Sequence, residues 1–109
     1  MSEGLTLDAY QEAAARTINA ALAKDDRLLD AACGLAEEAG EVLAHVRKHA
    51  MQGRTLDRNA VVAELGDALW CLATVAGTLG VTLEAVAKTN LAKLHARHPQ
   101  GLHREPLAQ

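Results

Sequence analysis

Two pairs of carboxylates could do chemistry together, because each pair is spaced three residues apart within a segment of helical apolar pattern. Glu38 and Glu41 form one pair, and Glu64 and Asp67 form the other. At about 100° per residue, both pairs fall on the same side of the apolar stripe of their own helix. If the two stripes pack together, the four carboxylates converge at the edge of one seam. A fifth acid, Glu37, lies one position before the first pair.

Converging carboxylates are unfavourable without a counter-ion. Like charges one helical turn apart already cost about 0.2–0.5 kcal/mol on an exposed helix, and partly buried ones become protonated. A divalent cation removes this penalty, and an all-oxygen ligand set suits Mg²⁺ or Mn²⁺ rather than Zn²⁺. A di-iron centre would require histidine where Ala44 and Trp70 stand, three residues after an acid. The alternative interpretation is a solvated acidic face without a metal.

The composition favours an all-α domain. The chain has 109 residues, of which half are hydrophobic and only 2% are aromatic, so its apolar content is mainly Ala, Leu and Val. Ala and Leu are strong helix formers, whereas β-sandwiches and barrels need more aromatic and β-branched residues. We expect one domain over residues 1–101 and a polar tail over residues 102–109.

Apolar residues recur at helical spacing in four segments that are separated by turn signals. The pattern predicts helices over about residues 6–24, 28–51, 57–80 and 82–98. Thr6, Asp57 and Thr82 are the expected N-caps, and Gly53 is expected to end the second helix. Residues 24–27 are expected to form a polar joint. Short connections predict a compact four-helix bundle, and two-sided apolar faces predict a homo-oligomer, either a dimer or a tetramer.

Charge and cysteine content exclude several classes of protein. The net charge of −3 disfavours a protein that binds nucleic acid polymers. Cys33 and Cys71 lie far apart, as expected of free thiols in a reducing compartment. Residues 1–8 do not resemble a signal peptide, and the most apolar stretch, residues 68–81, is too short to span a bilayer. We therefore expect a cytoplasmic protein without a membrane partner.

The acids and their spacing resemble the signature of a known family, the all-α nucleoside triphosphate pyrophosphohydrolases of the MazG type. The matching residues fall in two groups separated by 22 residues: Glu37, Glu38 and Glu41, then Glu64 and Asp67. Tyr10-Gln11 and residues 88–99 are similar to the entry segment and the closing helix of that family. The resemblance covers about residues 5–101. The same superfamily contains dimeric dUTPases and phosphoribosyl-ATP pyrophosphohydrolases.

The resemblance implies an activity and a role for each acid. The implied reaction is Mg²⁺-dependent hydrolysis between the α and β phosphates of a nucleoside triphosphate, giving a monophosphate and pyrophosphate, for housekeeping of the nucleotide pool. Glu37 matches the acid that orients or deprotonates the attacking water. The other acids match the metal ligands: Glu38, Glu41, Glu64 and Asp67. Phosphoryl chemistry agrees, because it requires neutralised phosphate charge and an in-line water.

Two alternatives to this function remain open at this point. The first is another enzyme of the superfamily, either a dUTPase or a phosphoribosyl-ATP pyrophosphohydrolase. The second is a non-catalytic helical module that binds a metal or a partner. A panel of nucleotide substrates distinguishes these hypotheses, because only the enzymes release pyrophosphate.

The last predicted helix carries candidate substrate-binding residues. Asn90 lies within its apolar stripe, and Lys93 and Arg97 follow at helical spacing. The functional interpretation places Asn90 at the base or sugar and the two cations at the phosphates. The alternative is a buried core amide with two cations whose stems cover apolar surface.

Three further residues have both a functional and a structural interpretation. Gln11 lies within an apolar stripe and could contact the base, although a core hydrogen bond to backbone is favoured. Trp70 lies opposite the stripe of its helix, which favours a subunit interface or, second, a base-stacking pocket. His45 follows Glu41 by one turn and could support the metal site, although an ordinary surface histidine is favoured.

Overall fold

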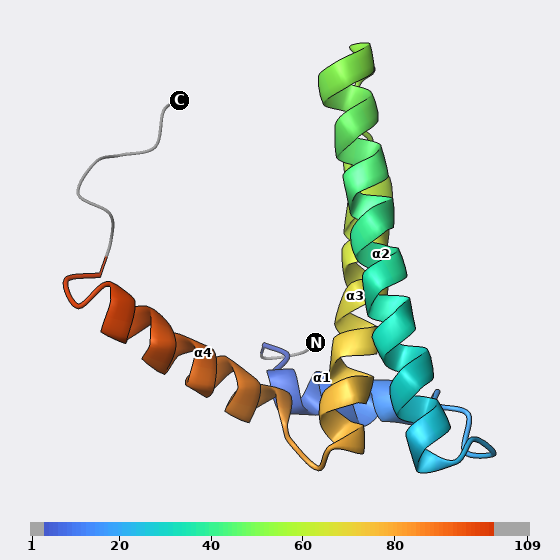
Figure 1. Ribbon diagram of the computed structural model, residues 1–109, viewed down its shortest axis with the longest axis vertical. Coiled ribbons are helices and arrows are strands. Elements are labelled where there is room, and N and C mark those ends of the chain that lie inside the picture. Colours follow the sequence, from blue (N-terminus) through green and yellow to red (C-terminus); the bar gives the residue numbers. More distant parts are fainter. Residues whose placement is uncertain (1–3, 102–109) are drawn as a thin grey trace.

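The computed structural model describes residues 4–101, which form four α-helices and no strand. The helices are α1 (Leu7–Ala15), α2 (Lys24–Gln52), α3 (Arg58–Thr78) and α4 (Leu83–Arg97). Figure 1 shows α2 and α3 side by side as a long antiparallel hairpin, with α1 across its lower end and α4 leading away from it. The all-α prediction is therefore confirmed. The predicted tail, residues 102–109, lies outside the described residues.

The helix ends follow the capping residues that the sequence predicts. Each predicted N-cap accepts a hydrogen bond through its side-chain oxygen from the backbone N–H three residues later: Thr6, Asp57 and Thr82. These bonds satisfy donors that have no partner inside the helix. Gly53 ends α2 with a φ of 68°, a left-handed conformation that glycine adopts without steric cost.

The connection between the first two helices differs from the prediction. α1 ends at Ala15, and residues 24–27 are the first turn of α2 rather than a polar joint. In the intervening residues 16–23, side chains bond to nearby backbone in place of helical hydrogen bonds. The hydroxyl of Thr17 donates to the carbonyl three residues earlier, and the amide oxygen of Asn19 accepts from the N–H two residues later.

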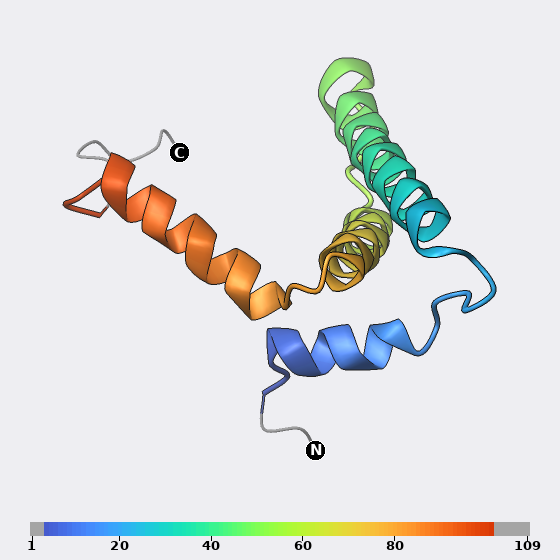
Figure 2. The ribbon, with the colours of Figure 1, turned by 60° about the horizontal axis from the view of Figure 1, so that its bottom comes forward.

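The expected compact bundle is wrong for the single chain. α2 packs along α3, and α1 packs on α3, but α4 contacts only α1 and α3 and never α2. Figure 2 shows α4 diverging from the hairpin. The radius of gyration is 16.9 Å, against about 13 Å for a compact domain of this length. The helix faces predicted from the apolar stripes are only partly buried. On α4, large side chains such as Leu91 stay exposed.

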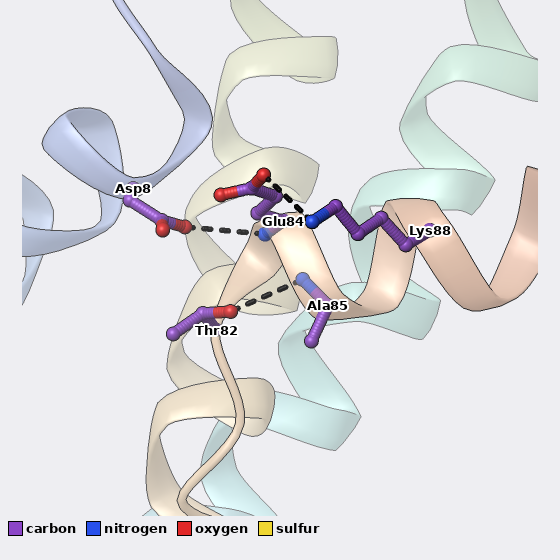
Figure 3. A network of polar contacts seen from close by, with 5 residues as sticks. All are labelled: Asp8, Thr82, Glu84, Ala85 and Lys88. Atoms are coloured by element: carbon purple, nitrogen blue, oxygen red, sulfur yellow. Dashed lines mark hydrogen bonds and ion pairs between the residues drawn. The ribbon is translucent and has the colours of Figure 1, made fainter.

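The first turn of α4 is attached to α1. Asp8 of α1 accepts a hydrogen bond at 3.2 Å from the N–H of Glu84, beside the cap that Thr82 makes to the N–H of Ala85 (Figure 3). A carboxylate at a helix N-terminus is also favoured by the helix dipole. α4 therefore begins at a fixed place relative to α1.

Gln11 strengthens this junction with three hydrogen bonds to backbone. Its amide nitrogen donates to the carbonyls of Ala73 and Val81 at 3.2 and 3.1 Å, and its amide oxygen accepts from the N–H of Leu83 at 2.9 Å. The side chain thereby ties α1 to α3 and to the start of α4. This is the core hydrogen bonding that the sequence favoured. Contact with a nucleotide base stays a prediction; both N–H donors of Gln11 are already used, and its amide oxygen keeps one lone pair.

α3 is the central helix. By length and composition it is apolar enough to cross a membrane, so the expectation that the most apolar stretch is too short to do so is wrong on these two criteria, which the core helices of soluble proteins also meet. It also packs against each of the other three helices and carries Glu64 and Asp67. Its buried side chains are small, among them Ala73 and Ala76, which lets neighbouring helices approach closely.

Gly34 of α2 faces Cys71 of α3 one turn from the acids. A Cβ added at Gly34 would lie 2.8 Å from the Sγ of the buried Cys71. Gly34 precedes Glu38 by four residues, and Cys71 follows Asp67 by four. This contact therefore sets the helix spacing next to the acidic residues.

We predict that Gly34→Ala destabilises the native chain but stabilises the Cys71→Ala variant. Alanine is favoured over glycine by about 1 kcal/mol in a helix interior, and only the sulfur opposes it here. Urea unfolding of the four proteins in a double-mutant cycle measures the coupling. A substitution effect of the same sign in both backgrounds would contradict the proposed contact.

Candidate metal centre

Three acids from two helices meet on the hairpin. Glu38 of α2 and the pair Glu64 and Asp67 of α3 each offer a carboxylate oxygen, and these oxygens all lie within 4.8 Å of one another. The spacing of three residues puts the α3 pair on one helix face, and that face is turned toward α2. We call these three residues the acid cluster.

Glu38 is the most perturbed member of the acid cluster. With both carboxyls ionised, its Oε1 is buried without a hydrogen-bond partner. Its pKa is raised to about 7, first because its protonated form hydrogen-bonds with Glu64, then by burial, and then by the negative charges of Asp67, Glu64 and Glu41. Burial and the neighbouring negative charges therefore favour the protonated form of Glu38 below about pH 7.

The donor set fits a hard divalent cation. All three groups of the acid cluster present carboxylate oxygens, and one buried oxygen of Glu38 has no partner. Such ligands suit Mg²⁺ and Mn²⁺ and not the softer metals that prefer sulfur or imidazole. A cation at this place would relieve both the repulsion and the unsatisfied oxygen.

Glu41 and Glu37 stand outside this convergence. Both side chains are exposed, and Glu41 is not among the three that meet within 4.8 Å. The charge of Glu41 still contributes to the raised pKa of Glu38, so the two lie near each other. The structure therefore brings together three of the four predicted ligands, and a ligand role for Glu41 stays a prediction.

His45 is the residue that the sequence analysis undervalued. Its Nε2 lies 3.6 Å from the Oε2 of Glu64, and the two side chains are 27% and 22% exposed. The favoured interpretation as an ordinary surface histidine is therefore wrong. A signal was available, because His45 follows Glu38 by seven residues and two helical turns return a side chain to nearly the same face.

The side of the acid cluster toward α1 is lined by groups that stay neutral. Burial, followed by the charges of Glu38 and Asp67, raises the pKa of the Cys71 thiol. Burial, followed by the charge of Asp67, raises the pKa of the Tyr10 phenol. Ionisation of either group would add negative charge beside the carboxylates, so neither supplies them with a counter-charge.

The candidate substrate residues of α4 lie apart from the acid cluster within one chain. Asn90, Lys93 and Arg97 are all exposed, and α4 does not contact α2. The alternative interpretation of Asn90 as a buried core amide is therefore wrong for the single chain, and contact with a base or sugar stays a prediction. Asn90 and Lys93 instead line an open surface pocket together with Val81, Ala85, Val86 and Thr89.

Trp70 contacts the connection between α1 and α2. Its ring is half-buried, and its Nε1 donates a hydrogen bond of 2.7 Å to the hydroxyl of Thr17. This bond satisfies the polar edge of the ring inside one chain. A subunit interface or a base-stacking pocket at Trp70 stays a prediction.

We predict that Mg²⁺ raises the melting temperature, and that the increase becomes larger as pH rises through about 7. Cation and proton compete for Glu38, whose pKa is about 7 in the folded chain. Thermal unfolding at about pH 6 and about pH 8, with and without Mg²⁺, measures the increase. Equal increases at the two pH values would contradict a site at Glu38.

The metal-free protein should show the opposite trend with pH. Because the raised pKa belongs to the folded state, that state binds more protons than the unfolded chain between pH 4.5 and about 7. The contribution of Glu38 to stability is therefore lost as pH rises across that window. Glu38→Gln should flatten the decline and remove the Mg²⁺ effect, whereas the exposed Glu12→Gln should change neither.

Comparisons with known proteins identify the family of the chain. The chain matches the family model of the MazG nucleotide pyrophosphohydrolase domain over residues 28–102. It is 37% identical over 73 residues to the "Gene 37 protein" of Mycobacterium phage L5, a match that covers 63% of this chain and 64% of that protein. The chain thus matches less than two thirds of that relative's length. No solved structure matches the chain significantly. Because residues 28–102 are more than half of the chain, it belongs to the MazG nucleotide pyrophosphohydrolase domain family.

Proposed function

We propose that the protein is a Mg²⁺-dependent nucleoside triphosphate pyrophosphohydrolase of the cytoplasmic nucleotide pool. One observation carries the proposal: three carboxylates of a MazG-type domain meet within 4.8 Å, and one of their buried oxygens has no partner. Membership of a nucleotide pyrophosphohydrolase family supports the reaction class.

The residues divide into ligands and a base. The acid cluster would hold the cation, with Glu41 joining by a side-chain rotation from its place near Glu38. Held by these residues, Mg²⁺, or Mn²⁺ as a substitute, would supply the positive charge that the phosphate chain requires. Glu37 is exposed beside Glu38 and accepts a proton from water. The water oxygen bonds to the α phosphorus, the bond from that phosphorus to the bridging oxygen breaks, and pyrophosphate leaves with the bridging oxygen.

The substrate contacts on α4 require a second chain. Lys93, Arg97 and Asn90 are exposed on a helix that does not contact α2, so they would meet the nucleotide beside the acid cluster of a partner. A homo-oligomer also explains the exposed apolar surface. Large apolar side chains more than half exposed include Leu29, Leu43, Val62, Leu65 and Leu91.

We expect Asp67→Ala and Glu41→Ala to abolish pyrophosphate release while leaving helicity unchanged, because each removes a ligand oxygen from an exposed side chain. The assay offers canonical, deoxy and damaged nucleoside triphosphates and phosphoribosyl-ATP with Mg²⁺ and identifies the products. Glu12→Ala, an exposed acid on α1, serves as the matched control.

Near-normal turnover by both variants would refute the site. Exclusive turnover of dUTP or of phosphoribosyl-ATP would assign the chain to one of those activities. Release of γ-phosphate would contradict cleavage between the α and β phosphates. No product from any nucleotide would favour a non-catalytic module.

We expect the chain to sediment with at least twice its monomer mass of 11.5 kDa. Leu91→Glu places a charge on the exposed apolar face of α4 and should shift the assembly toward monomer while retaining helicity. The control is Thr89→Glu, a charge at an exposed polar position of the same helix. A wild-type chain that sediments as a monomer would overturn the shared arrangement.

A further inference from the structure

Glu64 lies between two residues of α2. It interacts with Glu38 on one side, and its Oε2 lies 3.6 Å from the Nε2 of His45 on the other. Since Glu38 and His45 are seven residues apart, they share a face of α2 with about two turns between them. The carboxylate of Glu64 reaches from α3 into the space between these two side chains.

His45 differs from the other neighbours of Glu64 because its ring can carry a positive charge. Across residues 4–101, the only ion-pair contact made by any member of the acid cluster is the one between Glu64 and His45. The remaining neighbours of Glu64 in the cluster are acids, which repel its carboxylate. Without a donor on the far side, this repulsion and the side-chain entropy of glutamate both favour rotation away from the cluster.

We propose that His45 is a positioning residue that orients Glu64 for cation binding. The Nε2 of His45, 3.6 Å from Oε2 of Glu64, would draw that oxygen to its side, which leaves the other carboxylate oxygen of Glu64 for the acid cluster. A histidine that supports a ligating carboxylate in this way acts on the affinity for the ion and not on the chemical step. The inference rests on the proposed function only in taking the acid cluster as a cation site.

The experiment measures Mn²⁺ binding by electron paramagnetic resonance at about pH 8, with no nucleotide present. We expect His45→Ala to weaken binding roughly tenfold, as outer partners of metal ligands commonly do. His45→Gln should restore most of the affinity, because its amide N–H reaches a position similar to Nε2–H. His95→Ala, an exposed histidine on α4, is the control and should bind as the wild type does.

A second readout separates positioning from a general loss of structure. In the nucleotide assay, the Mg²⁺ concentration for half-maximal rate should rise in His45→Ala, while kcat at saturating Mg²⁺ stays near that of the wild type. Thermal unfolding of each metal-free variant establishes that it is folded. An unchanged or tighter Mn²⁺ affinity in His45→Ala, or a glutamine variant as weak as the alanine one, would overturn the inference.

The two proposals fail in different ways. Suppose that the Mn²⁺ affinities of the wild type, His45→Gln and His45→Ala fall in the expected order, but the wild type releases no pyrophosphate. The proposed function is then wrong and the role of His45 stands. If the wild type turns over nucleotides and the Mn²⁺ affinity does not depend on His45, the role of His45 is wrong and the function stands.

Discussion

Repulsion among three carboxylates is the constraint that the hairpin imposes and on which the proposed site depends. Glu38, Glu64 and Asp67 are held near one another by two packed helices, so none can move far to escape the others. This crowding contributes to the pKa of about 7 at Glu38, so a proton is favoured there below about pH 7. A bound cation would relieve the same repulsion, which the fold itself imposes. Rigid helices are therefore part of the site and not merely its support.

The core explains how the acids come within reach. The buried residues are small, among them Ala31 and Ala73, and Gly34 allows α2 to approach the sulfur of Cys71. Short side chains between two helices reduce the distance between their axes, and carboxylates at the seam can then meet. The consequence is a thin core, with large side chains such as Leu91 left in solvent. The packing that forms the acid cluster thus leaves the single chain short of buried apolar surface.

Much of this could be predicted from the sequence, and the failures have two causes. Periodicity identifies four helices and caps identify the starts of α1, α3 and α4, because both depend on neighbours along the chain. The polar residues 24–27 were misassigned because charges at a helix N-terminus look like a linker in sequence. The exposure of Asn90 and the contact between His45 and Glu64 depend on which helices pack against each other. The helical pattern predicts the apolar face of a helix but not the helix that packs on it.

The junction between α1 and α4 carries a consequence for domain boundaries. Asp8 and Gln11 fix the start of α4, yet both lie outside residues 28–102, the part of the chain that the MazG family model covers. A fragment trimmed to those residues would keep the five acids of the candidate site and lose the hydrogen bonds that orient the helix bearing Lys93 and Arg97. The segment that matches the family model is therefore shorter than the length of chain that fixes the position of α4.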